Sequence, residues 1–472
     1  MIWSVTQVVG RQGITLLIFA ILALLLNPKD FGILGMAMAW IAFIQVFSEM
    51  GFGAALIQRQ NVNSKHFSTI FFINITIGMF LTIIGILLSW PCAWFFKTPA
   101  IQPIMAILSF GFIISSFSLT QMAILQKELR FRDLATRDIS AALIGGLAGI
   151  IFAYLKFGVW SLVAQSLTTY LIGSILLWFV SEWRPKLKEF SFECVKDLWS
   201  YSSKIFAFQI FKFFTQNTDK IIIGYFLGPI ALGLYTFAYK FVVYPVSMVT
   251  GAIGQYLFPK FSKIQNDLTS VKSSYLFITK ATNSIVAPIM VIVIFLSPTL
   301  IPSIFGQKWS QAILLIQIFS ILGIITPWIS FAGQGMKALD RPGWLFNWSI
   351  FITVVASVFM LIGIYYKGIV GVTLGITVAY IFAIPVIFNI VNKLIHVNVS
   401  EILNSFFPSI LSSLLAGLVL WIGKSKIFLN HTTSFMGIIF IVLFYFVCLT
   451  IFDKSFVFTM FKKLRKYEIL TR

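Results

Sequence analysis

Long apolar stretches recur along the whole chain, and they constrain its fold more than any other feature. Each is about 20 residues or longer, the length that an α-helix needs to cross the hydrocarbon core of a bilayer. The chain has 472 residues, of which 59% are hydrophobic and only 11% charged, and its mean hydropathy is +0.94. These values exclude a soluble enzyme, a disordered chain and a disulfide-rich scaffold. They leave a polytopic membrane protein.

Fourteen transmembrane helices are expected from these stretches, so the expected fold class is all-α. Helices are the expected form because every backbone group has to be hydrogen-bonded inside a bilayer. The first stretch contains Arg11 and has no small-residue cleavage site, so we expect a retained helix rather than a signal peptide. The runs at 31–57 and 231–258 are long enough to predict a tilt or a kink. The expected spans are 5–26, 31–57, 68–96, 101–125, 134–155, 159–180, 201–226, 231–258, 277–302, 311–336, 344–366, 369–390, 403–423 and 433–452.

The basic residues predict the orientation of these spans. The formal net charge is +20, from 35 Lys+Arg and 15 Asp+Glu. If both termini are cytoplasmic, 24 of the Lys and Arg residues fall in the cytoplasmic loops and tail, seven fall in the outer loops, and four lie inside spans. This bias follows the positive-inside rule and predicts a membrane protein with both termini in the cytoplasm. It also explains the basicity without a nucleic-acid partner, and we expect none.

An internal repeat predicts two similar halves. Residues 26–33 (LNPKDFGI) resemble residues 227–234 (LGPIALGL) at an offset of 201, and Tyr154-Leu155-Lys156 resembles Tyr365-Tyr366-Lys367 at an offset of 211. Spans 1–6 and 7–12 are therefore expected to be two pseudo-symmetric lobes, as in transporters with parallel repeats. The expected divisions are an N-lobe (1–183), a cytoplasmic amphipathic linker (184–200), a C-lobe (201–392), and a final segment with helices 13–14 and a basic tail (393–472).

Ionisable residues inside the spans are candidate site residues, since each costs roughly 2.5–3.5 kcal/mol to insert at a helix centre. We expect four cations to face a cleft and bind an anionic substrate: Arg11, Lys212, Lys220 and Lys240. Glu49 and Asp219 are the candidates for binding a coupling ion, H⁺ or Na⁺. Ion pairing and snorkelling are the alternatives, although Asp219 and Lys220 are adjacent and do not face each other on a helix.

Amide side chains within the apolar runs are expected to line the same cleft, where they could pair with sugar hydroxyls; helix–helix hydrogen bonding is the alternative for some of them. The candidates are Asn74, Gln121, Gln209, Gln216, Asn283 and Asn347. Cys92, Cys194 and Cys448 are far apart in the sequence, so no metal site is expected. No phosphate-cradling glycine-rich loop occurs, so neither ATP nor any other cofactor is expected. No catalytic residues are expected either.

Five motifs carry a family resemblance: 49–58 (EMGFGAALIQ), 125–132 (LQKELRFR), 219–228 (DKIIIGYFLG), 233–240 (GLYTFAYK) and 258–262 (FPKFS). They resemble segments of Wzx-type polysaccharide flippases, in the colanic-acid and teichuronic-acid exporter branch of the multidrug/oligosaccharidyl-lipid/polysaccharide superfamily. The resemblance covers roughly residues 5–390 and implies a bacterial inner-membrane protein. Within the motifs, Asp219 matches an acidic position of the family, whereas the proposed roles of Arg11 and Lys212 rest on the physical argument alone.

The resemblance implies transfer of undecaprenyl-diphosphate-linked oligosaccharide from the inner to the outer leaflet, by alternating access, for surface polysaccharide biosynthesis such as that of lipopolysaccharide or exopolysaccharide. The implied partners are the lipid-linked glycan, the bilayer and the polysaccharide polymerase machinery. Two alternatives stay open. One is a cation-coupled multidrug or metabolite antiporter of the same superfamily. The other, an enzyme such as a polymerase or ligase, is disfavoured because the short outer loops hold no cluster of catalytic groups.

Overall fold

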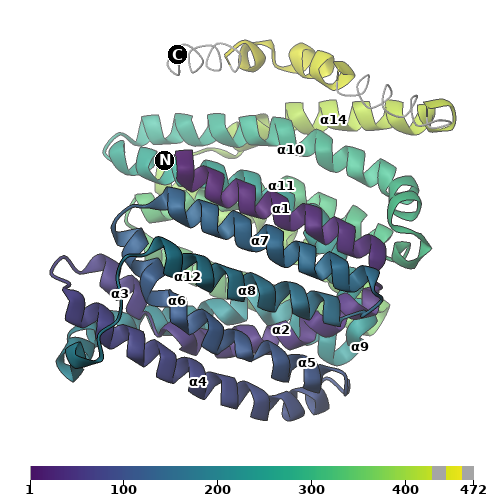
Figure 1. The fold of residues 1–472 in the computed structure, drawn as a ribbon. Helices are drawn as coiled ribbons and strands as arrows, with labels where there is room; N and C mark the ends of the chain where they lie inside the picture. The colour runs from purple at the N-terminus through teal and green to yellow at the C-terminus, as the bar shows by residue number, and fades with distance from the viewer. Residues whose placement is uncertain (1, 428–442, 460–472) are drawn as a thin grey trace. The chain divides into compact units, whose positions relative to one another are not determined.

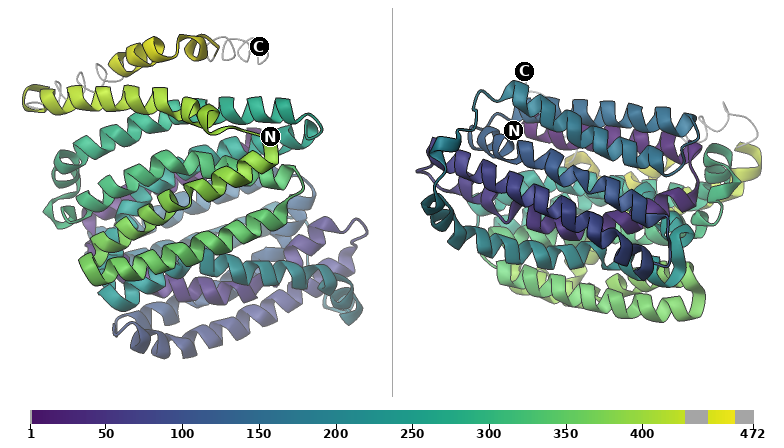
Figure 2. Two further views of the ribbon diagram at one scale, coloured as in Figure 1. Left: turned by 180° about the vertical axis from the view of Figure 1, so that it is seen from behind. Right: turned by 60° about the horizontal axis from the view of Figure 1, so that its bottom comes forward.

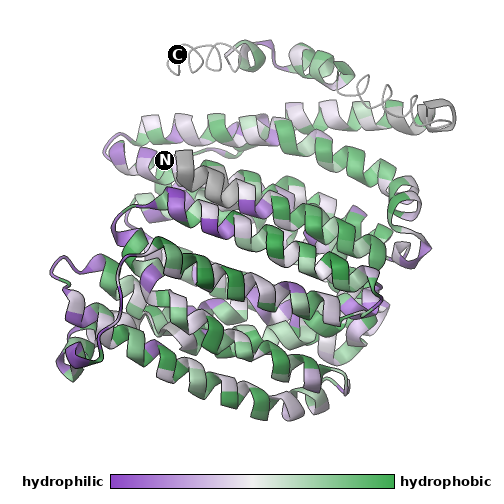
Figure 3. Cartoon of the chain, viewed as in Figure 1, coloured by the Kyte–Doolittle hydropathy of each residue, from purple (hydrophilic) through white to green (hydrophobic). Residues whose placement is uncertain are grey.

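The computed structural model describes residues 2–427 and 443–459, and this part of the chain is helical with no β-strand (Figure 1). The all-α prediction is therefore confirmed. Apolar residues cover most of the length of the helices, and strongly hydrophilic residues gather near their ends (Figure 3). The helices are α1 (Ile2–Leu25), α2 (Pro28–Glu49), α3 (Phe52–Gln58), α4 (Ser64–Phe95), α5 (Ile101–Leu108), α6 (Phe110–Lys127), α7 (Phe131–Tyr154), α8 (Trp160–Val180), η1 (Leu187–Glu189), α9 (Phe192–Lys263), α10 (Leu268–Phe305), η2 (Gln307–Trp309), α11 (Ala312–Ala338), α12 (Pro342–Phe382), α13 (Ile384–Ile395) and α14 (Val399–Ile427).

The described helices account for thirteen of the fourteen expected spans and for part of the last one. Ten stretches are long and apolar enough to cross a membrane, and two shorter apolar helices lie at Gly10–Leu25 and Leu443–Phe452. Two of the ten hold two expected spans each, because the backbone leaves the helical conformation at Gly228 in α9 and at Lys367 and Gly368 in α12. The last expected span, 433–452, lies partly outside the described residues. The chain is thus a multi-pass membrane protein.

The kink expected in the run 31–57 is present. Helix α2 ends at Glu49, and the next two residues, Met50 and Gly51, have φ values of 43° and 78°. This left-handed conformation favours glycine, which has no β-carbon. Helix α3 then starts at Phe52, so the apolar run is divided into two helices.

Contacts divide the chain into two compact units. The first comprises residues 1–237 and 360–372, and the second comprises residues 238–359 and 373–472. In the first unit, α7 packs against both α1 and α8, and α4 packs against α6 (Figures 1 and 2). In the second unit, α10 packs against both α11 and α14.

The two copies of the repeated motif contact each other within the first unit. A β-carbon on Gly32 would lie 1.6 Å from the carbonyl oxygen of Pro229, and one on Gly233 would lie 1.8 Å from that of Pro28. Gly233 and Pro229 follow Gly32 and Pro28 by the repeat offset of 201 residues. The contact is therefore reciprocal, as two-fold related segments require. Neither glycine can be replaced without moving a backbone.

The segment that follows α8 is attached to the ends of α3 and α4. The Glu189 carboxylate accepts hydrogen bonds from the hydroxyls of Ser64 (2.5 Å) and Ser68 (3.1 Å). Asp197, in the first turns of α9, lies 3.2 Å from the Arg59 guanidinium. Leu198 is buried among the side chains of α3 and α4, whereas Phe192 is exposed. This segment therefore buries Leu198 against the neighbouring helices and leaves Phe192 exposed.

A carboxylate caps the start of α10. Asp267 accepts hydrogen bonds from the backbone N–H groups of Thr269 and Ser270 and from both hydroxyls. The Ser270 and Thr269 hydroxyls lower the pKa of Asp267 from its usual 3.8 to about 2. Because the pKa is lowered in the folded state, the stabilisation is present above pH 3.8 and is lost as the pH falls toward 2.

We therefore expect Asp267→Ala to lower the midpoint temperature of unfolding of the purified protein at pH 6, since the N-cap bonds are lost. The difference between the variant and the wild type should shrink as the pH falls from about 4 toward 2, where the wild-type carboxylate becomes protonated. Asp267→Asn, which keeps the capping oxygen, is the control and should show little change. A difference between Asp267→Ala and the wild type that is independent of pH would contradict the assignment.

Candidate functional site

Three charged side chains meet within the helices of the first unit. The Asp138 carboxylate of α7 lies 2.6 Å from the guanidinium of Arg137 on the same helix and 3.7 Å from that of Arg11 on α1. Asp138 is 8% exposed, whereas the Arg11 side chain is 59% exposed. Arg137 also donates a hydrogen bond from Nε to the carbonyl of Gly173 on α8. The cluster thus joins α1, α7 and α8.

This cluster keeps a net positive charge. Two guanidinium groups share one carboxylate, and the more exposed of the two is Arg11. A buried carboxylate is stable only when it is paired and hydrogen-bonded, so Asp138 holds Arg137 against α8 and leaves Arg11 accessible. Such an arrangement can attract an anion, because fixed cations replace part of the hydration that an anion loses inside a membrane.

Asp219 and Lys220 do not pair with each other through their side chains, as their spacing predicted. The Tyr235 hydroxyl donates a 2.7 Å hydrogen bond to the Asp219 carboxylate. The Lys220 ammonium donates a 2.9 Å hydrogen bond to the side-chain oxygen of Asn217, one turn earlier. Both oxygens of the Asp219 carboxylate thus accept a hydrogen bond, Oδ2 from the buried Tyr235 and Oδ1 from the backbone N–H of Lys220, and these bonds fix its orientation.

The other predicted cations are placed differently. Lys212 is exposed, and so is Gln216 one turn further along α9, while Gln209 is half-buried. Lys240 is half-buried and belongs to the second unit, as do Asn283 and the exposed Asn347. The side chain of Glu49 lies outside the described part of the structure. The assignment of all these residues to one binding cleft therefore stays a prediction.

Two of the predicted amides lie at a helix–helix contact. The Asn74 side chain of α4 is buried and donates a 3.4 Å hydrogen bond to the Thr120 hydroxyl of α6. Gln121, next to Thr120, is fully buried, and neither end of its amide has a hydrogen-bond partner among the described residues. Asn283 of α10 is also fully buried, and its amide likewise has no hydrogen-bond partner among the described residues. Asn74 thus bridges α4 and α6, which is the helix-joining role considered as the alternative.

Sequence reasoning missed the acidic partner of Arg11. Neither Arg137 nor Asp138 was among the predicted site residues, although both lie within α7. The sequence did contain a signal for them. Arg137 and Asp138 are adjacent ionisable residues inside the expected span 134–155, and ionisable residues inside a span are candidate site residues. Tyr235 was also missed, since a buried tyrosine becomes informative only when its hydroxyl is placed beside Asp219.

The fold and these intramembrane charges define a multi-pass helical membrane protein of the transporter class. A family model described as "Polysaccharide biosynthesis protein" matches residues 21–314. The chain belongs to this family, and the resemblance to polysaccharide-export flippases is thereby confirmed.

Known proteins agree with this assignment. The chain is 27% identical to the teichuronic acid biosynthesis protein TuaB of Bacillus subtilis, over 79% of this chain and 77% of that protein. It is 25% identical to the lipopolysaccharide biosynthesis protein WzxC of Escherichia coli, over 79% and 76%. A solved structure of the lipid II flippase MurJ, in an inward closed conformation, matches with a TM-score of 0.78 at 15% identity and covers 97% of this chain and 99% of that one. The MurJ match shows that the fold is shared.

Proposed function

We propose that this protein moves a polyprenyl-diphosphate-linked oligosaccharide from the inner to the outer leaflet of the bacterial cytoplasmic membrane, by alternating access. The substrate lipid is undecaprenyl diphosphate, and the product feeds surface polysaccharide synthesis. Both termini lie in the cytoplasm, and the polymerase machinery acts on the flipped product. The protein is not an enzyme, since flipping forms and breaks no covalent bond.

The observation that carries this proposal is the family match, which spans 294 residues, together with relatives that serve polysaccharide biosynthesis. The charged cluster on α1 and α7 adds a physical reason. A diphosphate is strongly anionic, and Arg11 supplies an accessible cation whose neighbours leave a net positive charge. The sugar-binding role of the amides belongs to the same proposal.

Reversing two of the proposed substrate-facing charges tests it directly. We expect Arg11→Glu combined with Lys212→Glu to lower surface polysaccharide by more than ~10-fold, because each charge-assisted hydrogen bond contributes roughly 1.5–3 kcal/mol. The measurement is complementation of a strain that lacks its own flippase, with the protein level in the membrane followed by immunoblot. Lys29→Glu, an exposed residue at the start of α2, is the matched control. Normal polymer in the double variant would refute the cation role.

Asp219 is the proposed coupling residue, and its hydrogen bond makes a clean test possible. Asp219→Asn keeps an oxygen that can accept from Tyr235 but removes the negative charge needed to hold H⁺ or Na⁺. We expect flipping in proteoliposomes to fall by at least ~10-fold, the effect of losing one charged interaction of about 1.4 kcal/mol or more, with little change in thermal stability. Tyr235→Phe, which keeps the carboxylate, should retain ion dependence. Unchanged flipping by Asp219→Asn, with or without an ion gradient, would exclude this residue.

A cation-coupled drug antiporter is the second candidate, because it belongs to the same superfamily. Cationic drugs require an excess of acidic groups, whereas the cluster around Asp138 has an excess of arginine. A drug-efflux assay in a host lacking its own pumps separates the two functions.

A further inference from the structure

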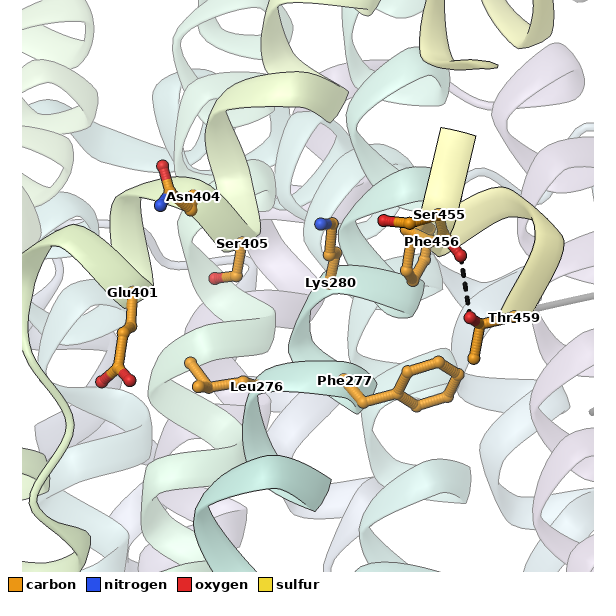
Figure 4. Close-up of a pocket in the computed structure, with 9 residues that line it drawn as sticks. All are labelled: Leu276, Phe277, Lys280, Glu401, Asn404, Ser405, Ser455, Phe456 and Thr459. Atoms are coloured by element: carbon orange, nitrogen blue, oxygen red, sulfur yellow. Dashed lines mark hydrogen bonds between the residues drawn. The ribbon is translucent and has the colours of Figure 1, made fainter. Parts of the chain in front are cut away.

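A pocket of about 390 Å³ lies in the second unit where α10, α14 and the segment 454–459 meet. Its lining combines three apolar side chains with six polar or charged ones, as the close-up shows (Figure 4). The lining residues are Leu276, Phe277, Lys280, Glu401, Asn404, Ser405, Ser455, Phe456 and Thr459. A volume of this size suits a small polar group rather than a whole sugar chain.

The charges around the pocket balance. Lys280 forms an ion pair with Asp453 and lies over the Phe456 ring, 4.9 Å from its centre. On the α14 side, Glu401 lies 2.8 Å from the ammonium group of Lys272. Two lysines thus face two carboxylates. A dianionic diphosphate would gain little net attraction here, whereas a zwitterion could place one charge near each pair.

Neutral polar groups lie on both sides of Lys280 (Figure 4). The Asn404 amide is exposed and makes no hydrogen bond to any described residue. On the other side of Lys280, the Ser455 hydroxyl donates to the Asp453 carboxylate and the Thr459 hydroxyl donates to the Ser455 carbonyl, so neither offers its hydrogen to a ligand (Figure 4). An amide N–H is a donor that phosphate oxygens accept from. The pocket therefore offers a cation at Lys280, an amide donor at Asn404 and a carboxylate at Glu401.

An apolar face of α14 adjoins Asn404. Leu403 and Phe407 lie one turn apart on one side of Asn404 and are 59% and 63% exposed. On the orientation predicted by the basic residues, this end of α10 and α14 lies at the cytoplasmic boundary of the bilayer, where lipid headgroups lie. A ligand with a polar head and acyl chains could occupy the pocket and this surface together.

We propose that the pocket binds the headgroup of a phosphatidylethanolamine molecule of the cytoplasmic leaflet. Its ammonium group hydrogen-bonds to Glu401, its phosphate lies at Lys280 and Asn404, and its acyl chains run along Leu403 and Phe407. The lipid joins α14 and the segment 454–459 to α10. The test measures binding of a lipid rather than flipping of the glycan, so its outcome does not depend on the proposed function.

Lipid titration of the purified full-length protein, followed by native mass spectrometry, tests the proposal. Phosphatidylethanolamine should bind at least ~10-fold more tightly than phosphatidylcholine, whose trimethylated head cannot donate to Glu401; a hydrogen bond to a charged group contributes about 1.5–3 kcal/mol. Glu401→Gln should remove this preference. Equal binding of the two lipids by the wild type would overturn the proposal, and so would tighter binding of phosphatidylglycerol, which would indicate an anion site.

A second variant avoids the risk that Glu401→Gln disturbs folding. Asn404→Leu should weaken binding of phosphatidylethanolamine by about 3- to 10-fold, the effect of one neutral hydrogen bond, with an unchanged unfolding temperature. Asn389→Leu, an exposed amide on α13 outside the pocket, is the matched control and should bind like the wild type. Soluble phosphoethanolamine should bind far more weakly than the lipid. Competition at similar concentrations would contradict the role of the apolar surface, and equal binding by the Asn404 and Asn389 variants would contradict the pocket.

Discussion

Replacing Asp138 by alanine is expected to destabilise the protein by about 3–5 kcal/mol, the cost of removing one partner from a buried ion pair. Asp138 is almost fully buried and its carboxylate lies 2.6 Å from Arg137. Without it, the bond to the Gly173 carbonyl is the one hydrogen bond that Arg137 keeps with the described residues, and no described carboxylate then balances its charge. The measurement is thermal or denaturant unfolding of the purified protein in detergent.

Asp133 provides a matched control on the same helix. Its carboxylate also pairs with an arginine, Arg130, at 2.7 Å, but both side chains are about one-third exposed. Exposed ion pairs contribute roughly 0.2–1 kcal/mol, so Asp133→Ala should have a small effect. Equal effects of the two substitutions would show that the Asp138 cluster is solvated and would weaken its proposed electrostatic role.

Replacing Gly32 by valine is expected to have the other largest effect, a loss of more than about 4 kcal/mol or failure to fold. The new β-carbon would lie 1.6 Å from a backbone oxygen, so no rotamer can relieve the overlap. The turn at Pro229 would have to move, and with it the junction between the two halves of α9. Yield of folded protein on gel filtration and the midpoint of unfolding measure the effect.

The reciprocal contact makes a stricter prediction. Gly233→Val should cost nearly as much as Gly32→Val, because it meets the Pro28 oxygen at 1.8 Å. Since one displacement of the two turns relieves both overlaps, the double variant should cost less than the sum of the single ones. Gly53→Ala is the control: its β-carbon would meet nothing within 4 Å, and a helical alanine should be neutral or stabilise by about 0.5–1 kcal/mol. Strict additivity would mean that the turns do not meet.

Much of the fold could be predicted from sequence because a bilayer imposes a one-dimensional pattern. Apolar length alone gave the spans, including the break between the two helices within α9, where Leu227-Gly228-Pro229 interrupts the apolar run. The repeat at offset 201 was also visible, since a short motif of proline and glycine was retained in both copies. Its meaning was not visible: that Gly32 faces Pro229 across a pseudo-two-fold contact depends on two turns far apart in the chain.

The candidate site was only half predictable. The free-energy cost of inserting a charge into a membrane identified Arg11 as a candidate from sequence alone. Its carboxylate partner Asp138 was not predictable, because it is 127 residues away in sequence and is brought close only by the packing of α1 on α7. Asn74 and Gln121 were expected to line a cleft because amides are polar, yet polarity does not say which side of a helix faces a neighbour. Asn74 reaches Thr120, so its environment is set by the contact of α4 with α6.

The sequence by itself determined that the chain crosses a membrane many times and to which family it belongs, because both depend on composition and order along the chain. Only the tertiary structure decided which charged groups have partners and which stay accessible: Asp138 lies beside Arg11, Asp219 accepts a hydrogen bond from Tyr235, and Lys280 pairs with Asp453. The physical reason is that electrostatic energy depends on distance and burial, and neither quantity exists until helices distant in sequence pack side by side.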